Sequence, residues 1–455
     1  MTWTGRTWWI AAMGLGLDAG LAAADPASAP AAEVARPAGG AEADLSKQVD
    51  LDAATRIALA RNPDIQEAVD RAGAAGARAR AAGRLPDLAV QTQLWQQPLS
   101  TPLDFSKANM VMAGLRQTFP APGSLSARER AGQADAAAAR ALADGRRADI
   151  LQQVRRAYSQ YWLSEQEQLI HLEHMELTDR IVQDARAYFR HGRMQKADYL
   201  RTTVELARVH AILSDAAQQR RASGALLNTL MGRDPDAPLG TPREVPLPDV
   251  EAPAADLEAQ ALGKPDVVAA RDAVARAAAQ LEGAQAEAAW PEFMVGLDYG
   301  YMPVERSSAY TAMFGFTLPW LSPRRTDEKR VAAAELAAAE QALASVTNQA
   351  RFQLRDARAR YRAARDTHDL VERELLPQTQ EAAAASQEAF ANSQSDALGL
   401  LDTLRNLLQV RLELVRARAR VTEAWADLER AASAAASDPR VAGPSGAPST
   451  EGTKP

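Results

Sequence analysis

Cysteine is absent from this chain of 455 residues. That absence excludes disulfides, thiolate metal sites and a lipid-modified N-terminal cysteine. Aromatic residues make up only 5% of the chain and there are five histidines, so few side chains of these types are available for catalysis. No apolar run in the expected mature chain is long enough for a membrane-spanning helix. The net charge of -6 gives no reason to expect nucleic-acid binding.

Proline is missing from a long internal stretch, between Pro122 and Pro235. The residues there are rich in Ala, Leu, Arg, Glu and Gln, which favour helix. We therefore expect a long helical hairpin over residues 121–231, and at ~1.5 Å per residue its first arm would be on the order of 100 Å long. Apolar stripes in the two arms predict antiparallel coiled-coil packing. They are Leu151, Val154, Tyr158 and Trp162 in the first arm, and Leu200, Val204, Ala207 and Ala211 in the return arm.

The same order of segments occurs a second time. A second hairpin is expected over residues 325–432, with a near-heptad seam on its return arm. That seam consists of Leu401, Leu404, Leu408, Leu412 and Val415. The chain is therefore predicted to be a duplicated helix–strand–strand–helix unit, mainly α, with repeats at 46–234 and 254–432 joined by a proline-rich linker at 235–253.

The two ends of the chain differ from the repeats in composition. Residues 1–24 combine a basic residue, a short apolar core and small residues before Asp25, which is typical of a signal peptide. Residues 25–45 are rich in Ala, Pro and Gly and are expected to form a flexible leader. Residues 433–455 are expected to form a disordered tail.

Each repeat also contains two segments in which apolar residues alternate with others. Strands are expected at about 87–98, 109–119, 292–303 and 309–319. The alternation is clearest in the second pair and gives one apolar face: Phe293, Val295, Leu297, Tyr299, Ala312, Phe314 and Phe316. Such strands, with aromatic residues near their ends, are typical of a transmembrane barrel with this face toward lipid.

Four strands cannot close a barrel, because an open edge leaves backbone groups unpaired in lipid and closure takes about eight strands or more. The chain would then borrow strands from copies of itself, and three copies would supply twelve. The alternative is a four-stranded sheet in a soluble α+β protein.

Several segments together resemble the outer-membrane efflux protein family, the TolC-like exit ducts of Gram-negative bacteria. They are residues 51–64, the proline-bounded strand pairs, Gly114-Leu115-Arg116-Gln117-Thr118-Phe119-Pro120 and Leu375-Leu376-Pro377-Gln378. The duplicated order of elements is more specific than any of these motifs. Residues 292–303 and 310–318 are most similar to the heavy-metal-efflux branch.

The resemblance implies a homotrimer with a twelve-strand β-barrel in the outer membrane and a twelve-helix α-barrel across the periplasm. It implies a passive, non-enzymatic exit duct without cofactors, which works with a periplasmic adaptor and an inner-membrane pump, of the RND type in this branch. Heavy-metal cations would be the cargo. A multidrug or type I secretion duct remains an alternative, as does a structural coiled-coil protein of the periplasm.

The resemblance also implies roles for particular residues. The two hairpin turns would meet the adaptor through Gly192, Arg193, Met194, Ser393 and Gln394. Asp198 lies six residues beyond Gly192 and Asp402 lies nine beyond Ser393. At these positions family members narrow the tunnel with acidic side chains, so both aspartates are gate candidates. The alternative is that they are ordinary solvated or capping residues.

Two other groups of residues could bind metal. His171 and His174 lie three apart on a helix beside Glu173, but a polar helix face accounts for them equally well. Five methionines in or near the strands could handle soft metals. They are Met110, Met112, Met294, Met302 and Met313. Methionine as a packing or lumen filler is the preferred interpretation, so no metal site is predicted.

Overall fold

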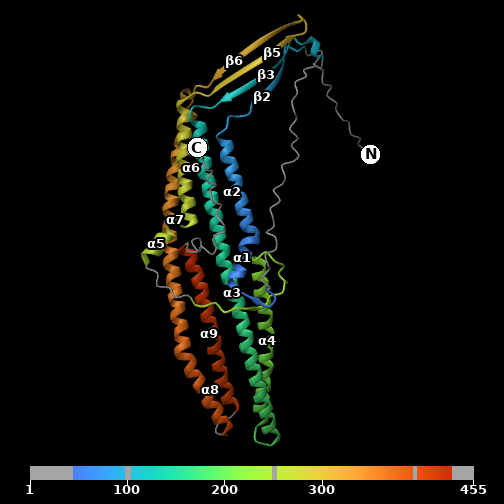
Figure 1. Ribbon diagram of the computed structural model, residues 1–455, viewed down its shortest axis with the longest axis vertical. Helices are drawn as coiled ribbons and strands as arrows, with labels where there is room; N and C mark the ends of the chain where they lie inside the picture. Colours follow the sequence, from blue (N-terminus) through green and yellow to red (C-terminus); the bar gives the residue numbers. More distant parts are fainter. Residues whose placement is uncertain (1–44, 98–103, 248–253, 393–396, 433–455) are drawn as a thin grey trace, which may run out of the picture. The chain divides into compact units, whose positions relative to one another are not determined.

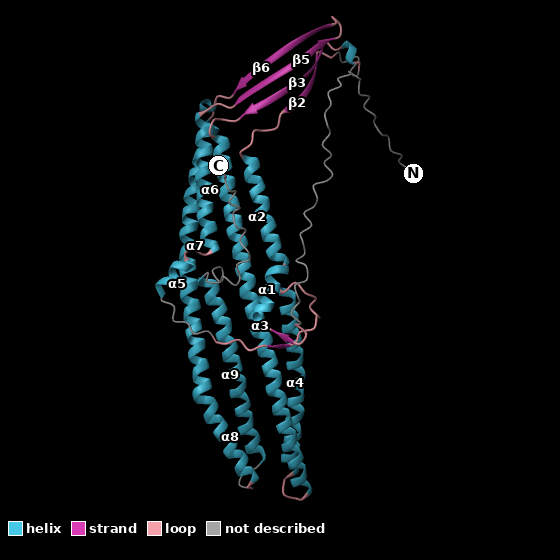
Figure 2. Ribbon diagram, viewed as in Figure 1, coloured by secondary structure: helices cyan, strands magenta, loops and turns pink. Residues whose placement is uncertain are grey.

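The computed structural model describes residues 45–97, 104–247, 254–392 and 397–432. The predicted signal peptide, the leader up to residue 44 and the predicted tail lie outside these ranges. The described part is mainly helical and carries one sheet of four strands (Figures 1 and 2).

The first repeat contains helices on both sides of a strand pair. Its elements are β1 (Gln48–Val49), α1 (Leu51–Arg61), α2 (Pro63–Ala82), β2 (Ala89–Trp95), η1 (Phe105–Lys107), β3 (Met110–Phe119), α3 (Ser124–Arg190) and α4 (Lys196–Leu230). β4 (Thr241–Pro242) follows in the segment predicted as a linker.

The second repeat follows the same order. Its elements are α5 (Ala254–Ala261), α6 (Pro265–Ala289), β5 (Phe293–Met302), β6 (Ser307–Phe316), η2 (Pro319–Leu321), α7 (Pro323–Leu370), the π-helical turn η3 (Val371–Leu375), α8 (Leu376–Ala391) and α9 (Ala397–Ala432). Within the described ranges, none of the helices combines the length and apolar character needed to cross a bilayer.

Helix α3 has 67 residues and packs against α2, α4, α6 and α9, so it belongs to the core of both repeats (Figure 1). The predicted stripe is confirmed as its buried face, since Val154 and Tyr158 are almost fully buried and Leu151 and Trp162 are buried as well. Ion pairs join α3 to the antiparallel α9, with Arg416 to Glu167 and Arg411 to Glu173 both at 2.6 Å.

The predicted stripe of the return arm is wrong for α4. Leu200 and Val204 are exposed, and Ala207 and Ala211 are exposed too. The buried face of α4 instead combines the apolar side chains of Val209 and Leu227 with small or polar residues, namely Thr202, Ser223, Gly224 and Asn228. Ser223 contacts Ser164 of α3, and small side chains of this kind let two helices approach closely. In α9, by contrast, the predicted seam is confirmed at Leu401, Leu404 and Leu412, which are buried, whereas Leu408 and Val415 are half-buried.

The predicted linker is partly built into the core. β4 pairs in parallel with β1, and the side chains of Leu239 and Val245 pack against the main hydrophobic cluster. The Tyr158 hydroxyl lies 2.9 Å from the carbonyl oxygen of Val49 and 2.7 Å from that of Arg243. Burial raises the pKa of Tyr158, so its hydroxyl stays protonated and able to donate.

The second hairpin is interrupted where a continuous first arm is expected. The π-helical turn η3 separates α7 from α8, and Pro377 follows it in the first turn of α8. Proline lacks an N–H group and its ring clashes with the carbonyl four residues earlier, so regular α-helix cannot run through this point unchanged. A wider turn before the proline accommodates it.

The four strands form an antiparallel sheet in the order β2-β3-β5-β6. The strands lie where the alternation predicts them, with ends that differ from the predicted bounds by three residues at most. Within the described chain β2 and β6 are edge strands, because each has one strand neighbour. The sheet follows α2 and α6 and leads into α3 and α7, so helices adjoin one end of it (Figure 2).

Candidate functional site

One face of the sheet is apolar and exposed. The strand register places Val295 opposite Phe314, Leu297 opposite Ala312 and Tyr299 opposite Tyr310. Partners in register lie on the same face. The seven residues predicted from the sequence to face lipid therefore share one face of β5 and β6. The ring centroids of Phe293 and Phe314 are 5.9 Å apart.

The face continues across the other two strands. Leu115 of β3 pairs with Leu297 on one side and with Val90 of β2 on the other. Phe314 is 65% exposed and Leu297 is 58% exposed, whereas Asp298 on the opposite face is 5% exposed. Contiguous exposed apolar surface on a folded chain marks an interaction with a membrane or another protein.

The opposite face carries polar side chains. Gln91 donates a hydrogen bond of 2.9 Å to the Asp298 carboxylate. Asp298 is buried because its side chain folds over Gly114, its partner in register on β3. The alternation along residues 293–299 predicts that Asp298 lies on the face opposite the apolar residues, but it does not mark Asp298 as a site. The available signal was a lone acidic residue inside a strand of Gly, Tyr and Leu.

The turn between α3 and α4 is one of the two predicted tips. The N–H of Arg193 donates to the carbonyl of Tyr188 and that of Gly192 to the carbonyl of Phe189. This is the Schellman arrangement, which needs a left-handed residue after the helix, and Gly192 has φ of 68°. Gly192 and Arg193 are exposed.

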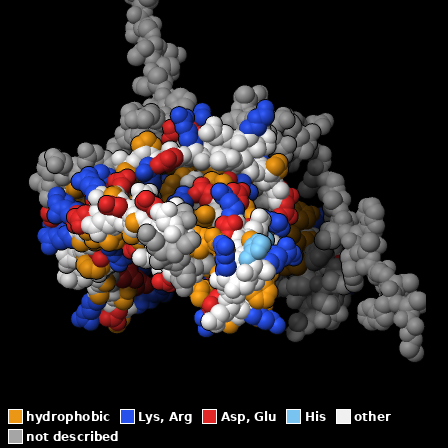
Figure 3. All heavy atoms as spheres, turned by 90° about the horizontal axis from the view of Figure 1, so that it is seen from below, with side chains coloured by type: hydrophobic (Ala, Val, Ile, Leu, Met, Phe, Trp, Pro, Cys, Tyr) orange, Lys and Arg blue, Asp and Glu red, His pale blue; other side chains and the backbone are white. Residues whose placement is uncertain are grey.

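Met194 behaves differently from its neighbours at this tip, since it is half-buried against a hydrophobic cluster. That cluster contains Ile181, Ala383, Leu400, Leu401 and Leu404 and joins α3, α8 and α9 near their ends. Of the other predicted tip residues, Ser393 and Gln394 lie outside the described residues. Viewed from below, the described surface mixes basic, acidic and apolar side chains (Figure 3).

Both gate candidates lie one helical turn before an arginine. Asp198 is 3.4 Å from Arg201, and Asp402 is 3.5 Å from Arg405. Arg405 also contacts Glu205, at the shorter distance of 3.0 Å. The Asp402 side chain is 84% exposed, and an ion pair at such exposure contributes little. Asp402 is therefore the more available of the two carboxylates, although the structure does not bring the two together.

The histidines considered for metal binding are buried in α3. Burial lowers the pKa of His171 and of His174, and both imidazoles are therefore neutral near pH 7. Glu173 points away into an ion pair with Arg411. Among the described residues one cluster has the spacing for a metal ion, and it is a different one: His368, Asp369 and Glu372 on α7 and η3. Asp369 is already engaged by Arg365 and Arg373.

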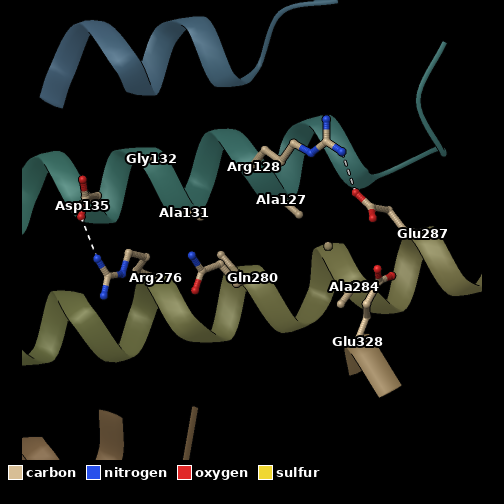
Figure 4. Close-up of a pocket in the computed structure, with 12 residues that line it drawn as sticks. Ala127, Arg128, Ala131, Gly132, Asp135, Arg276, Gln280, Ala284, Glu287 and Glu328 are labelled. Atoms are coloured by element: carbon tan, nitrogen blue, oxygen red, sulfur yellow. Dashed lines mark hydrogen bonds and ion pairs between the residues drawn. The ribbon is translucent and has the colours of Figure 1, made fainter. Parts of the chain in front are cut away.

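A groove of about 560 Å³ lies between α3 and α6 (Figure 4). Its floor consists of alanines and glycines, and ion pairs bridge it: Arg128 to Glu287 at 2.7 Å and Arg276 to Asp135 at 3.0 Å. These pairs join the two repeats. The side chains around the groove neutralise one another and form no arrangement of nucleophile and base.

Comparisons with known proteins relate this architecture to export channels. Residues 54–233 match the outer membrane efflux protein family. The matched segment runs from α1 to the end of α4 and so covers the first repeat. Among curated proteins no sequence matches this chain. The family match confirms the prediction of a non-enzymatic protein.

Solved structures extend the likeness to the second repeat. The outer membrane protein VceC from Vibrio cholerae has 20% identity and a TM-score of 0.69, with coverage of 84% of this chain and 95% of its own. The MtrE outer membrane channel of Neisseria gonorrhoeae has 21% identity and a TM-score of 0.68, with coverage of 84% and 88%. CusC, described as forming a transmembrane channel, has 17% identity and a TM-score of 0.73, with coverage of 84% and 91%.

These likenesses show that the chain has the fold of these outer membrane channel proteins. The TM-scores of the three proteins are similar, so the likeness in fold does not favour one of them over the others. The predicted heavy-metal branch is therefore not distinguished from the others.

Proposed function

We propose that the chain is the outer membrane channel of a tripartite efflux system and works as a homotrimer. The observation that carries this proposal is the sheet with one exposed apolar face and two free edges within the described chain. In lipid, unpaired edge groups cost several kcal/mol each. Three copies would pair β2 of one chain with β6 of the next and close a barrel with this face toward lipid.

The long helices would then extend from the outer membrane into the periplasm. The tip at Gly192 and Arg193, together with the second tip at Ser393 and Gln394, would meet a periplasmic adaptor, which connects to an inner-membrane pump of the RND type. Lipid of the outer membrane would be the other partner. The chain offers no site for nucleotide or catalysis among its described residues, so energy would come from the pump.

Heavy-metal cations are the proposed cargo, with drugs or secreted proteins as the alternative. The support is the likeness of residues 292–303 and 310–318 to the heavy-metal branch. A deletion strain, with and without a complementing copy, would be grown on metal salts, antibiotics and detergents. Selective sensitivity to metals such as cobalt, zinc, copper or silver supports the metal duct, and sensitivity to drugs alone supports the multidrug branch.

The duct itself is tested in planar bilayers with the purified protein. We expect stepwise conductance that is selective for cations, because a trimer would carry a ring of Asp402 carboxylates at the periplasmic end of the channel. Asp402→Asn should reduce that preference, and Asp366→Asn, on the helix α7 away from the mouth, serves as the matched control. Unchanged selectivity in Asp402→Asn removes the gate role. A water-soluble protein without conductance would support the structural coiled-coil alternative.

A further inference from the structure

Half of the ten methionines of the chain lie on one face of the sheet. They occupy alternate positions on three strands: Met110 and Met112 on β3, Met294 and Met302 on β5, and Met313 on β6. Alternate residues of a strand share a face, and this face is the one opposite Phe314 and Leu297. In the proposed trimer it faces the lumen.

Two of these methionines lie over Gly300, and a third, Met302, lies beside them on the same face. Met112 is the partner of Gly300 in register. A Cβ atom built on Gly300 would lie 2.7 Å from the sulfur of Met110 and 3.4 Å from Cγ of Met112, so both side chains lie over this glycine. Met302 is two residues further along β5 on the same face, and the register that pairs Val111 with Tyr301 brings it opposite Met110.

The methionines of the sheet do not serve to fill the hydrophobic core. Met231, by contrast, does so, since it is fully buried in the main hydrophobic cluster. Met110, Met112 and Met302 are half-buried, and no helix of the described chain packs extensively against the sheet. These three side chains therefore lie on a partly open surface and not in a filled interior.

The donor chemistry of this surface is selective. Thioether sulfur is a soft, neutral ligand that favours Cu(I) and Ag(I) over Zn²⁺, Mg²⁺ and Ca²⁺. The chain has no cysteine, and its five histidines all lie outside the strands. Imidazole and thiolate, the donors that would hold Zn²⁺, are thus missing from the sheet. Asp298, two residues before Gly300, adds a carboxylate to the same face.

We propose that Met110, Met112 and Met302 form a binding site for a soft monovalent cation, Cu(I) or Ag(I), on the lumen face of the sheet. The proposal rests on the proposed duct, because only a closed barrel makes this face a lumen. Neutral thioethers hold such an ion without the charge attraction of a thiolate. Binding therefore remains weak enough for release, as conduction through a pore requires.

The test uses the full-length protein purified in detergent, with the metal ion alone as probe. Cu(I) is titrated under ascorbate against a chromogenic Cu(I) chelator, and Ag⁺ is titrated by calorimetry. The variant Met110→Leu/Met112→Leu/Met302→Leu keeps the side-chain volume and removes all three sulfur atoms. The control replaces two methionines that lie outside both the sheet and the proposed adaptor tips, Met175→Leu/Met231→Leu.

We expect one Cu(I) per chain in the wild type and in the control, and an affinity lower by about tenfold or more in the strand variant, since its ligands are lost. X-ray absorption should detect sulfur ligands on bound copper. Absence of binding in the wild type, or equal affinity in the strand variant, overturns the proposal. If the triple variant does not assemble, the Cu(I) affinity of the single variant Met110→Leu is compared with that of the wild type, and equal affinity again overturns the proposal.

Bilayer conductance without metal separates this proposal from the proposed duct. The strand variant should conduct ions like the wild type. Normal conductance with no copper binding rejects the site and leaves the duct intact, whereas a wild type that binds copper but never conducts rejects the duct.

Discussion

Gly114 offers a sharp test of how the strands β3 and β5 are paired. The space over this glycine is filled by the Asp298 side chain, and a Cβ at position 114 would also lie 2.6 Å from the carbonyl oxygen of Leu297. A carboxylate can rotate away, but a backbone oxygen moves only if the strand moves. We expect Gly114→Ala to cost about 1–3 kcal/mol per chain, the range measured for overpacking. In a homotrimer three such costs act on one assembly.

Gly315→Ala is the matched control for this prediction. Gly315 lies on the same face of the sheet, and an added Cβ would have its nearest neighbour, Cβ of Met294, at 3.8 Å, an ordinary contact. We expect a change within ~0.5 kcal/mol. The assay is the temperature at which purified trimers dissociate in detergent, followed on gels after stepwise heating. Dissociation of Gly114→Ala at the same temperature as Gly315→Ala would refute the pairing described here.

Two further predictions concern the lipid face and pH. Phe314→Lys should prevent membrane insertion, because a lysine near the bilayer midplane of a barrel costs ~2–4 kcal/mol; Thr311→Lys, on the opposite face, should insert, and equal insertion of both would contradict the face assignment. The buried His174 has a lowered pKa, chiefly through burial and then through His171. Its neutral form is thus favoured in the folded state, so stability should be lost as pH falls below about 6.5. The difference in melting temperature between pH 7.5 and pH 5 should be smaller in His174→Asn than in the exposed-tip control His191→Asn, and His171, whose pKa is lowered as well, accounts for the remainder. An equal difference in the two variants would exclude His174 as a source.

The long helices and the strands could be predicted because their signals extend over many residues. A stretch without proline marks α3, and ten residues of alternation fix which side chains of β5 share a face. The buried seam of α9 follows from leucine spacing. In each case many weak preferences point the same way.

Short or close-range features could not be predicted. β1 and β4 have two residues each, too few for a pattern, and their pairing depends on Tyr158 from a distant helix. The packing face of α4 is not predicted because its apolar residues Val209 and Leu227 are widely spaced among small or polar ones, while Leu200 and Val204 give the stronger hydrophobic signal. The position of Asp298 over Gly114 depends on strand register, which sequence alternation alone does not determine.

The unpaired edges of β2 and β6 make a single chain prone to aggregation before it assembles with other copies. Before it joins the proposed trimer, a single copy presents two strand edges with unsatisfied backbone groups beside an apolar surface. Such edges recruit any extended strand and lead to aggregation. The yield of this protein should therefore depend on how fast copies find one another and on chaperones that shield the sheet. A low rate of synthesis, or the loss of such a chaperone, should lower the amount of assembled protein even though the sequence is unchanged.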